Sequence, residues 1–488
     1  MRLLFASSEV FPLAKTGGLA DVSASLPRAL ATLGHEVWIA LPAYPAARAA
    51  LAEPMILGPV PGLSGATLVG GRLPGTELPV VLVDAPALFE RPGGPYGDAS
   101  GRDWPDNARR FHGFAHALCA IALDRAGLGW RPDLVHCNDW QTGLVPALLS
   151  RETQRPATVF TIHNQAYQGV FDRAQFDALD LPEAWWTPDA LEFYGGFSFL
   201  KAGLVFADQL TTVSPTYARQ LLEPEHGCGL DGLLRYRRDD FTGILNGIDA
   251  DIWNPATDPY LASPYDRATI DAGKRANKVA LQKELGLPAA ENIPLLGLVG
   301  RLVQQKGIDL VAEVIETWRG FPVQWVLLGS GEAAWEERLR VLAAERPEWV
   351  AVRIGYDEGL AHRIEAGADF FLMPSRFEPC GLNQMYSQRY GAIPVVHRTG
   401  GLADTVVDVL ARHDGDGNAA TGLVFDEPTA AALAQALERG LSLYRDPAAW
   451  RALRRNAMAG DFSWRRSAEQ YLAVYRRALA DAAGVAHG

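Results

Sequence analysis

Short apolar runs alternate with amphipathic stretches along the first half of the chain. The runs of strand length lie at residues 3–7, 37–41, 80–84, 134–137, 158–162, 209–213 and 241–245. Helical patterns lie between several of them, notably at residues 19–32, where Gly34 is placed to end the helix, and at 107–126. Near-continuous apolar strands are typical of a parallel sheet covered by helices on both faces.

The same alternation resumes after a polar, Pro-rich stretch. We predict a linker at residues 254–265. Further strands are expected at 295–299, 325–328, 350–354, 370–373, 394–396 and 423–425, with helices at 307–318 and 401–411 among them. The pattern predicts an α/β protein with two doubly wound, Rossmann-like domains, residues 1–253 and 266–462. A last helix at 463–483 can pack on either domain, including back on the first.

Composition narrows the class of protein. A chain of 488 residues favours two or three domains, and 48% hydrophobic with 21% charged residues is an ordinary globular balance. The apolar runs are too short to span a membrane, and Glu9 interrupts the N-terminal run before a signal peptide is complete. We therefore expect a cytoplasmic protein with no membrane partner. A net charge of −12 argues against a nucleic-acid partner. The four cysteines show no CxxC spacing, so we expect neither a zinc knuckle nor disulfides.

One hexapeptide occurs twice, once in each half. TGGLAD stands at residues 16–21 and again at 399–404, each time where a loop enters a helix. Glycines there allow positive φ and close approach of a ligand, and the helix start offers free N–H groups. Each copy alone is equally consistent with packing. The pair, with Lys15 beside the first copy, favours an anionic ligand held between the domains. Neither copy matches GxGxxG or GxxxxGK[ST], which disfavours a nicotinamide cofactor and an ATPase.

Charged groups follow two expected strands of the second half. Arg301 and Lys306 lie on the loop after strand 295–299, where ligands bind in doubly wound sheets. Two fixed cations can neutralise a diphosphate leaving group, and with no DxD-type pair beside a Gly-rich loop we expect them to replace a metal. Glu378 follows strand 370–373 and can steady positive charge on a sugar ring, although helix capping is an alternative reading.

Polar clusters also end two strands of the first half. HCNDWQ stands at residues 136–141 and TIHNQ at 161–165. Because the carboxyl ends of parallel strands meet at one edge, we expect Asp139, His163 and Asn164 to converge and to bind sugar hydroxyls, with Trp140 as a stacking face.

Together these motifs resemble the bacterial and plant glycogen/starch synthase family, retaining glucosyltransferases of the GT-B fold with a deep interdomain cleft. The resemblance covers essentially the whole chain. It rests on KTGGLAD (15–21), HCNDW (136–140), TIHN (161–164), EFYG (192–195), FLKAG (199–203), NGID (246–249), GRL with KG (300–302, 306–307) and SRFEPCGL (375–382).

The resemblance implies an ADP-glucose donor and elongation of an α-1,4-glucan at its non-reducing end, without metal or pyridoxal phosphate. By matching positions, Lys15 and Gly18 would face the donor phosphates and sugar, Arg301 and Lys306 the diphosphate, and Tyr356 the base. Glu378 would serve the glucose ring in catalysis, together with Asp139 and His163 on the sugar side. Asn246, Cys380, Gly381, Leu382, Gly400 and Gly401 would complete the nucleotide-sugar site, and Asp21 and Asn164 would belong to the acceptor side.

Two positions depart from the pattern of relatives. Tyr386 stands where many retaining GT-B enzymes carry a second glutamate, as is also the case in glycogen synthases, and Asn383 stands where we expect threonine. The residues leave open another GT-B sugar transferase, a phosphorylase-like enzyme with lysine-bound pyridoxal phosphate, and a non-catalytic glucan-binding relative. They also leave open ADP against UDP, the oligomeric state, the acceptor length and allosteric control.

Overall fold

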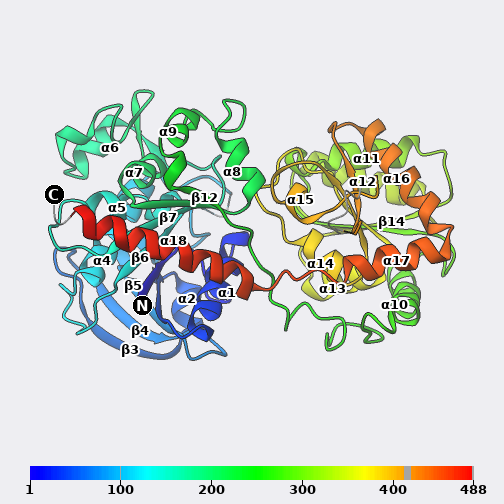
Figure 1. Ribbon diagram of the computed structural model, residues 1–488, viewed down its shortest axis with the longest axis horizontal. Helices are drawn as coiled ribbons and strands as arrows, with labels where there is room; N and C mark the ends of the chain where they lie inside the picture. Colours follow the sequence, from blue (N-terminus) through cyan, green and yellow to red (C-terminus); the bar gives the residue numbers. More distant parts are fainter. Residues whose placement is uncertain (99, 411–418, 486–488) are drawn as a thin grey trace. The chain divides into compact units, whose positions relative to one another are not determined.

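The computed structural model describes residues 1–98, 100–410 and 419–485, and the chain divides into two compact units (Figure 1). The first unit comprises Met1–Gly247 and the chain from Trp464 onward, and the second comprises Ile248–Ser463. Residues 254–265, expected as a linker, belong to the second unit. There Tyr265 is buried and donates a hydrogen bond of 2.7 Å to the carbonyl oxygen of Tyr390. The chain therefore changes unit earlier than its Pro-rich composition suggests.

The first unit is built on a sheet whose strand order, within the described residues, is β12-β11-β7-β6-β1-β2-β5-β4-β3. Its parallel strands are β1 (Arg2–Ala6), β2 (Glu36–Pro42), β5 (Pro79–Asp84), β6 (Leu134–Asn138), β7 (Ala157–Ile162), β11 (Gln209–Thr212) and β12 (Phe241–Gly243). Each lies where an apolar run predicted a strand. The antiparallel strands β4 (Thr67–Arg72) and β3 (Ala52–Pro59), the latter at the edge, were not predicted, because β3 is mostly exposed and β4 contains Gly70 and Gly71.

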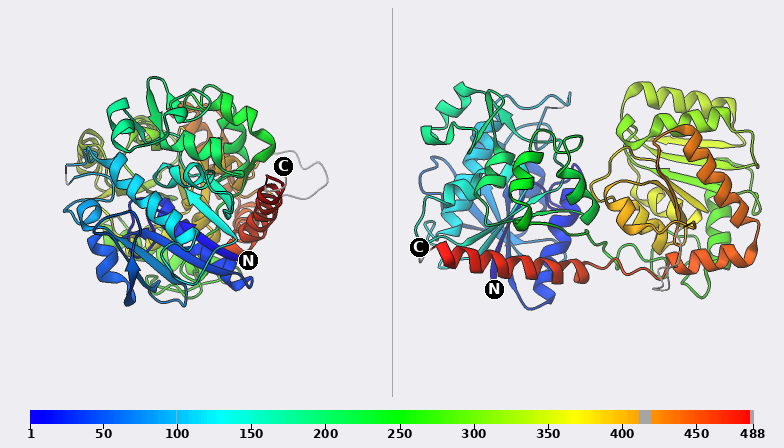
Figure 2. Two further views of the ribbon diagram at one scale, coloured as in Figure 1. Left: turned by 90° about the vertical axis from the view of Figure 1, so that its left-hand side faces the viewer. Right: turned by 45° about the horizontal axis from the view of Figure 1, so that its top comes forward.

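Two groups of helices cover this sheet. Helices α1 (Gly18–Thr32) and α18 (Trp464–Val485) pack together, and α18 also packs on β7 and β11. The second group is α4 (Asn107–Ala122), α5 (Leu144–Leu149) and α7 (Phe199–Phe206). The last helix thus packs on the first unit, along which it runs in Figure 2. Its Tyr475 hydroxyl lies 2.8 Å from Nδ1 of His136, in the middle of β6.

A small antiparallel sheet lies beside these helices. Its order is β8 (Val170–Phe171), β10 (Gly196–Ser198) and β9 (Glu192–Phe193). Strands of two or three residues leave no periodic signal, so the sequence did not predict them. Phe171, Phe197 and Phe199 pack there in one aromatic cluster.

The second unit contains a parallel sheet with the order β15-β14-β13-β16-β17-β18 in the described residues. Its strands are β13 (Leu295–Val299), β14 (Gln324–Gly329), β15 (Val350–Ile354), β16 (Phe370–Met373), β17 (Ile393–His397) and β18 (Leu423–Phe425), each at a predicted position. Apolar side chains line both faces: Leu296 and Leu298 pack in one core cluster, and Leu295 packs in the other. Burial on both faces explains why these strands read as continuous apolar runs.

Helices surround that sheet. They are α10 (Ile270–Leu285), α11 (Ile308–Thr317), α12 (Ala333–Glu345), α13 (Glu358–Gly367), α14 (Asn383–Arg389), α15 (Gly400–Thr405), α16 (Ala430–Tyr444) and α17 (Pro447–Ala457). The helix expected at 401–411 ends at Thr405, and residue 411 lies outside the described residues.

The strand order reverses once in each sheet. In the first unit β1 lies between β6 and β2, and in the second unit β13 lies between β14 and β16. In open parallel sheets ligands bind beyond the carboxyl ends of the strands at such switch points. The loops after β1 and β6, and those after β13 and β16, are therefore where a site is expected in each unit.

Candidate active site

The loop after β1 is held by a buried carboxylate. Glu9 is only 3% exposed, and it accepts hydrogen bonds from the backbone N–H of Thr16, from the Thr16 hydroxyl (2.6 Å) and from the N–H of Gly17 (3.1 Å). The Tyr96 hydroxyl donates to the same carboxylate at 2.5 Å. The loop entering α1 is thus fixed from inside the protein, which the sequence did not predict. A glutamate following an apolar strand was its only signal.

Lys15 extends from this loop. Its amine lies 2.8 Å from Oδ1 of Asp21, one turn into α1, and both side chains are partly exposed. The structure therefore brings together two residues that the sequence assigned to different sides of the site. An anionic ligand at Lys15 would compete with the Asp21 carboxylate for the ammonium group.

The two TGGLAD copies use their glycines differently. Gly17 has extended backbone (φ −155), and a Cβ on Gly17 or Gly18 would meet no atom within 4 Å. Gly400 has φ +42, and its Cβ would lie 1.9 Å from the carbonyl oxygen of Glu378. The Gly401 N–H is 3.2 Å from that oxygen and from the Pro379 oxygen. In the second copy the close approach is therefore to protein backbone, and the N–H of Gly401, expected to serve a phosphate, is already engaged.

Asp139 and His163 meet at the carboxyl ends of β6 and β7, as predicted. Oδ1 of Asp139 accepts the backbone N–H of His163 at 2.7 Å. Burial raises the pKa of Asp139 to about 7, against the opposing effect of N–H groups from His163 and Asn164. Asn164 lies beside them, and its side-chain oxygen accepts the N–H of Ala166 at 3.1 Å.

We expect this carboxyl to make stability depend on pH. The folded-state pKa lies above the ordinary value of 3.8, so the folded protein binds the proton more tightly. Its contribution is therefore fully present below about pH 4 and is lost as pH rises toward about 7. Asn at position 139 keeps the acceptor oxygen but cannot ionise. In urea unfolding at pH 5 and pH 8, Asp139→Asn should gain on the order of 2 kcal/mol relative to wild type at the higher pH. An equal difference at both pH values would contradict the shift.

His163 is neutral under ordinary conditions. Burial lowers its pKa to about 3, and its Nε2 lies 2.9 Å from Oδ1 of Asn138. Trp140, by contrast, offers no stacking face. It is 9% exposed, its ring packs edge-on against Phe111, and a Cβ at Gly169 would lie 2.4 Å from that ring. The prediction of a sugar-stacking role for Trp140 is wrong, because the aromatic cluster needs it as a core residue.

Asn246 follows β12 and carries an unsatisfied atom. The residue is 8% exposed, and its Oδ1 is buried with no hydrogen-bond partner among the described residues. An orphaned amide oxygen is costly in a folded protein unless a ligand or water supplies the donor. This fits the predicted contact of Asn246 with the nucleotide sugar.

The second unit places Lys306 against Glu378. The Lys306 ammonium lies 2.5 Å from Oε2 of Glu378, and the Ser375 hydroxyl donates to the same oxygen at 3.0 Å. The carboxylate side chain is buried (8% exposed), whereas the lysine side chain is more open (26%). Gly307, with φ +71, directly precedes α11, and a Cβ there would lie 2.2 Å from the Pro374 oxygen. Glycine at this position thus allows the two loops to approach.

A second ion pair fixes these loops. Arg376 makes a bidentate contact with Asp309 at 2.8 and 2.6 Å, and its N–H donates to the carbonyl oxygen of Gln305 at 2.8 Å. Arg301 is exposed, with one guanidinium nitrogen 3.2 Å from the Gln305 side chain. The pair predicted to bind a diphosphate therefore consists of one cation bonded to Glu378 and one open to solvent.

The remaining predicted residues differ in exposure. Tyr356 follows β15 and is 78% exposed, with its hydroxyl on Glu358. Cys380 is buried, and Gly381 has φ +72 in the turn before α14. Leu382 is half-buried at the start of that helix. The Tyr356 side chain is therefore largely exposed to solvent, whereas the Cys380 thiol is buried.

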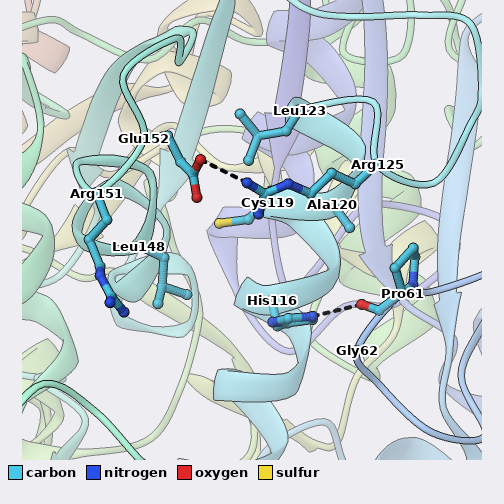
Figure 3. Close-up of a pocket in the computed structure, with 10 residues that line it drawn as sticks. All are labelled: Pro61, Gly62, His116, Cys119, Ala120, Leu123, Arg125, Leu148, Arg151 and Glu152. Carbon is cyan, nitrogen blue, oxygen red and sulfur yellow. Dashed lines mark hydrogen bonds and ion pairs between the residues drawn. The ribbon is translucent and has the colours of Figure 1, made fainter.

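A pocket lies elsewhere in the first unit. Its volume is about 540 Å³, and it opens between α4, α5 and residues 61–62 (Figure 3). The Arg125–Glu152 ion pair (2.7 Å) forms part of its wall. Cys119 also lines it, and burial raises the pKa of that thiol to about 12. None of the predicted site residues lines this pocket.

Two further findings concern the described part of the chain. No three His, Cys, Asp or Glu side chains gather there in a way that could hold a metal ion. No helix in that part is both long and apolar enough to cross a membrane.

Comparison with known proteins covers almost the whole chain. Residues 2–236 match the family described as starch synthase catalytic domain, and residues 283–457 match glycosyl transferases group 1. Glycogen synthase 1 of Methylococcus capsulatus is 56% identical over 480 residues, covering 98% of this chain and 97% of the relative. Glycogen synthase of Cellvibrio japonicus is 56% identical over 477 residues, covering 97% of this chain and 98% of the relative.

Solved structures agree in fold. The catalytic domain of starch synthase IV from Arabidopsis thaliana, bound to ADP and acarbose, is 35% identical with a TM-score of 0.88, covering 98% of this chain and 99% of that one. Sucrose-phosphate synthase from Thermosynechococcus elongatus shares the fold at 20% identity, with a TM-score of 0.61 and the same coverage of 98% and 99%.

Proposed function

Because the chain belongs to the glycogen and starch synthase family of GT-B glycosyltransferases, we propose that it transfers glucose from ADP-glucose to the terminal 4-hydroxyl of an α-1,4-glucan with retention of configuration. The observation that carries the proposal is the contact between Lys306 and Glu378 at the switch point of the second unit. A cation and a carboxylate held side by side there suit a reaction in which an anion leaves and a cationic sugar forms.

ADP is the proposed nucleotide. The Arabidopsis starch synthase structure is bound to ADP and acarbose. In this chain the solvent-exposed Tyr356 is the proposed stacking residue for the base. Arg301, also exposed, lies on the loop after β13, where a diphosphate would accept its guanidinium hydrogens.

Bond cleavage creates a negative charge on the departing ADP and a positive charge on the glucose ring. As the bond from C1 of glucose to the phosphate oxygen breaks, the electron pair leaves with ADP, and Arg301 and Lys306 stabilise the added negative charge. Glu378 steadies the oxocarbenium-like ring. The acceptor 4-hydroxyl attacks C1 from the side the leaving group vacates, and its proton passes to the departing phosphate oxygen. The anomeric configuration is therefore retained without a protein nucleophile, which fits Tyr386 in place of a second glutamate.

Sugar hydroxyls are the proposed ligands of the first unit. His163 is neutral, and the raised pKa of Asp139, about 7, leaves this carboxyl only partly ionised near neutral pH. Asn246 offers a buried amide oxygen that an O–H or N–H group can satisfy. Polar, weakly charged groups of this kind bind neutral hydroxyls without favouring an anion.

The proposal is tested with labelled donor and glycogen. Purified protein should incorporate glucose from ADP-glucose into the polymer, and an α-1,4-specific amylase should release the label. UDP-glucose serves as the comparison. Incorporation from neither donor by a folded protein would overturn the proposal, and incorporation only from UDP-glucose would overturn the choice of nucleotide.

Metal removal should leave the rate unchanged. Arg301 and Lys306 supply the positive charge that a divalent cation provides in other nucleotide-sugar enzymes. We therefore expect initial rates with and without excess EDTA to agree within about twofold, which is less than 0.5 kcal/mol. A rate that collapses in EDTA and returns with Mg²⁺ would contradict this. Absence of a visible-range chromophore would separately argue against a pyridoxal phosphate enzyme.

A further inference from the structure

We propose that Asn138 is a positioning residue that keeps His163 in its Nε2–H tautomer, so that Nδ1 accepts a hydrogen bond from a hydroxyl group of the sugar. The sugar contact rests on the proposed function, whereas the tautomer rests on the first unit alone. Asn138 is the last residue of β6, fully buried, and precedes Asp139.

Hydrogen bonds orient the Asn138 amide. Its Nδ2 group donates to the carbonyl oxygens of Ala6 (3.0 Å) and His136 (3.4 Å). Rotating the amide by half a turn would set its oxygen against those two carbonyl oxygens, with no proton between them. The network therefore assigns Oδ1 to the side that faces His163. Because Asn138 is the end of a central strand, the backbone fixes this geometry before any ligand arrives.

That oxygen decides where the imidazole carries its proton. Oδ1 lies 2.9 Å from Nε2 of His163, and an amide oxygen can only accept. Nε2 must then donate. Since burial lowers the pKa of His163 to about 3, the ring carries one proton in the neutral range, and that proton is on Nε2. Nδ1 keeps its lone pair, and within the described residues no hydrogen bond to it is formed.

The lone pair on Nδ1 of His163 determines which ligand groups can bind there. It accepts an O–H group, and it repels a phosphate or carboxylate oxygen that has no proton to give. The neighbouring Asp139 carboxyl accepts hydrogen bonds from backbone N–H groups, so it does not change this preference at Nδ1. The His163 position therefore favours a neutral sugar with a free hydroxyl over one that bears an anionic substituent there.

The first test is spectroscopic and needs no substrate. Nitrogen-15 NMR of protein with labelled histidine distinguishes the two neutral tautomers, and His163→Gln identifies the signal by its loss. We expect the Nε2–H form in wild type at pH 7. A His163 signal of the Nδ1–H form, or of imidazolium, would overturn the proposal, and this result does not depend on any Asn138 variant.

Variants at Asn138 extend the test. Asn138→Ala removes the acceptor, so the ring should show a mixture of tautomers, and kcat/KM should fall about tenfold, the value of one hydrogen bond. Asn138→Asp also removes the N–H group that faces the carbonyl oxygens of Ala6 and His136, and its negative charge beside the ring should shift the His163 signal toward imidazolium. Thr142→Val is the matched control, because the Thr142 hydroxyl donates to the Asn138 carbonyl oxygen (3.0 Å) without touching the imidazole. An unchanged tautomer in Asn138→Ala would refute the positioning role.

Donor analogues identify the hydroxyl. ADP-glucose analogues carry fluorine, which cannot donate, in place of one hydroxyl at a time. At one sugar position, replacing the hydroxyl with fluorine should lower the rate of the wild-type protein. The same replacement should not lower the rate of Asn138→Ala any further, because that variant has already lost the contact. If ADP-glucose is a good substrate and no position shows this coupling, the hydroxyl contact is refuted. If ADP-glucose itself is inert, the proposed function fails instead, and the NMR result still decides the tautomer.

Discussion

Glu378→Gln is expected to lower kcat for glucosyl transfer on the order of 100- to 1,000-fold while the protein stays folded. The amide keeps the shape of the side chain and an oxygen for the Ser375 hydroxyl. It removes the negative charge that stands 2.5 Å from Lys306 and that would face the developing cation on the sugar. Initial rates at saturating ADP-glucose and urea unfolding curves measure the two effects separately.

A second buried pair in the same unit provides the control. Lys278 and Asp369 lie 2.7 Å apart, with side chains 4% and 7% exposed, at the amino end of β16, whereas Glu378 follows its carboxyl end. Asp369→Asn should lower the free energy of unfolding by about 3–5 kcal/mol, because it leaves a buried ammonium unpaired. Its kcat per folded molecule should stay near wild type. If both variants lose stability and keep kcat, Glu378 holds the loop and takes no part in the chemistry.

Gly400→Ala is expected to disrupt both stability and activity, whereas Gly18→Ala should leave stability intact. At Gly400 a methyl group would fall 1.9 Å from the Glu378 oxygen at φ +42, so the turn carrying Glu378 must move. Overpacking of this kind costs about 1–3 kcal/mol. At Gly18 the added methyl meets nothing within 4 Å. Any effect there would come from the ligand, as a higher KM for ADP-glucose.

The two matched glycines separate a packing role from a binding role. Urea unfolding gives the stability of each variant, and steady-state kinetics gives its activity and its KM for ADP-glucose. A stable, active Gly400→Ala protein would mean that the turn around Glu378 tolerates displacement. An unchanged KM in Gly18→Ala would mean that the donor does not approach the first copy closely.

The sequence predicted the strands that are buried on both faces and missed the others. The strands of the second sheet coincide with apolar runs such as 295–299, because helices cover both faces of the sheet. The edge strand β3 has Met55 and Ile56 exposed to solvent, so its pattern resembles a loop. Strand ends were equally informative: Asp139 and His163 were expected to meet because parallel strands end at one edge, and they do.

Details that depend on a few ångströms did not follow from the pattern. Glu9 interrupts an apolar run in the sequence, and only the folded loop shows that its carboxylate binds Thr16 and Gly17. The repeat suggested equal roles for two glycine pairs, yet one pair contacts the Glu378 backbone and the other faces open space. A glycine motif indicates that another group approaches the backbone closely, but it does not say whether that group is protein or ligand.

The course of the chain also determines the order in which its parts can be completed during synthesis. The second unit is one continuous segment, Ile248–Ser463, inserted into the first, and Ile248 and Phe462 are joined by a backbone hydrogen bond of 2.8 Å where the segment opens and closes. The first unit lacks α18 until the ribosome has passed Tyr475, whose hydroxyl contacts His136. Strands β7 and β11 therefore receive their α18 cover last, and the inserted unit can form its core while its host is still incomplete.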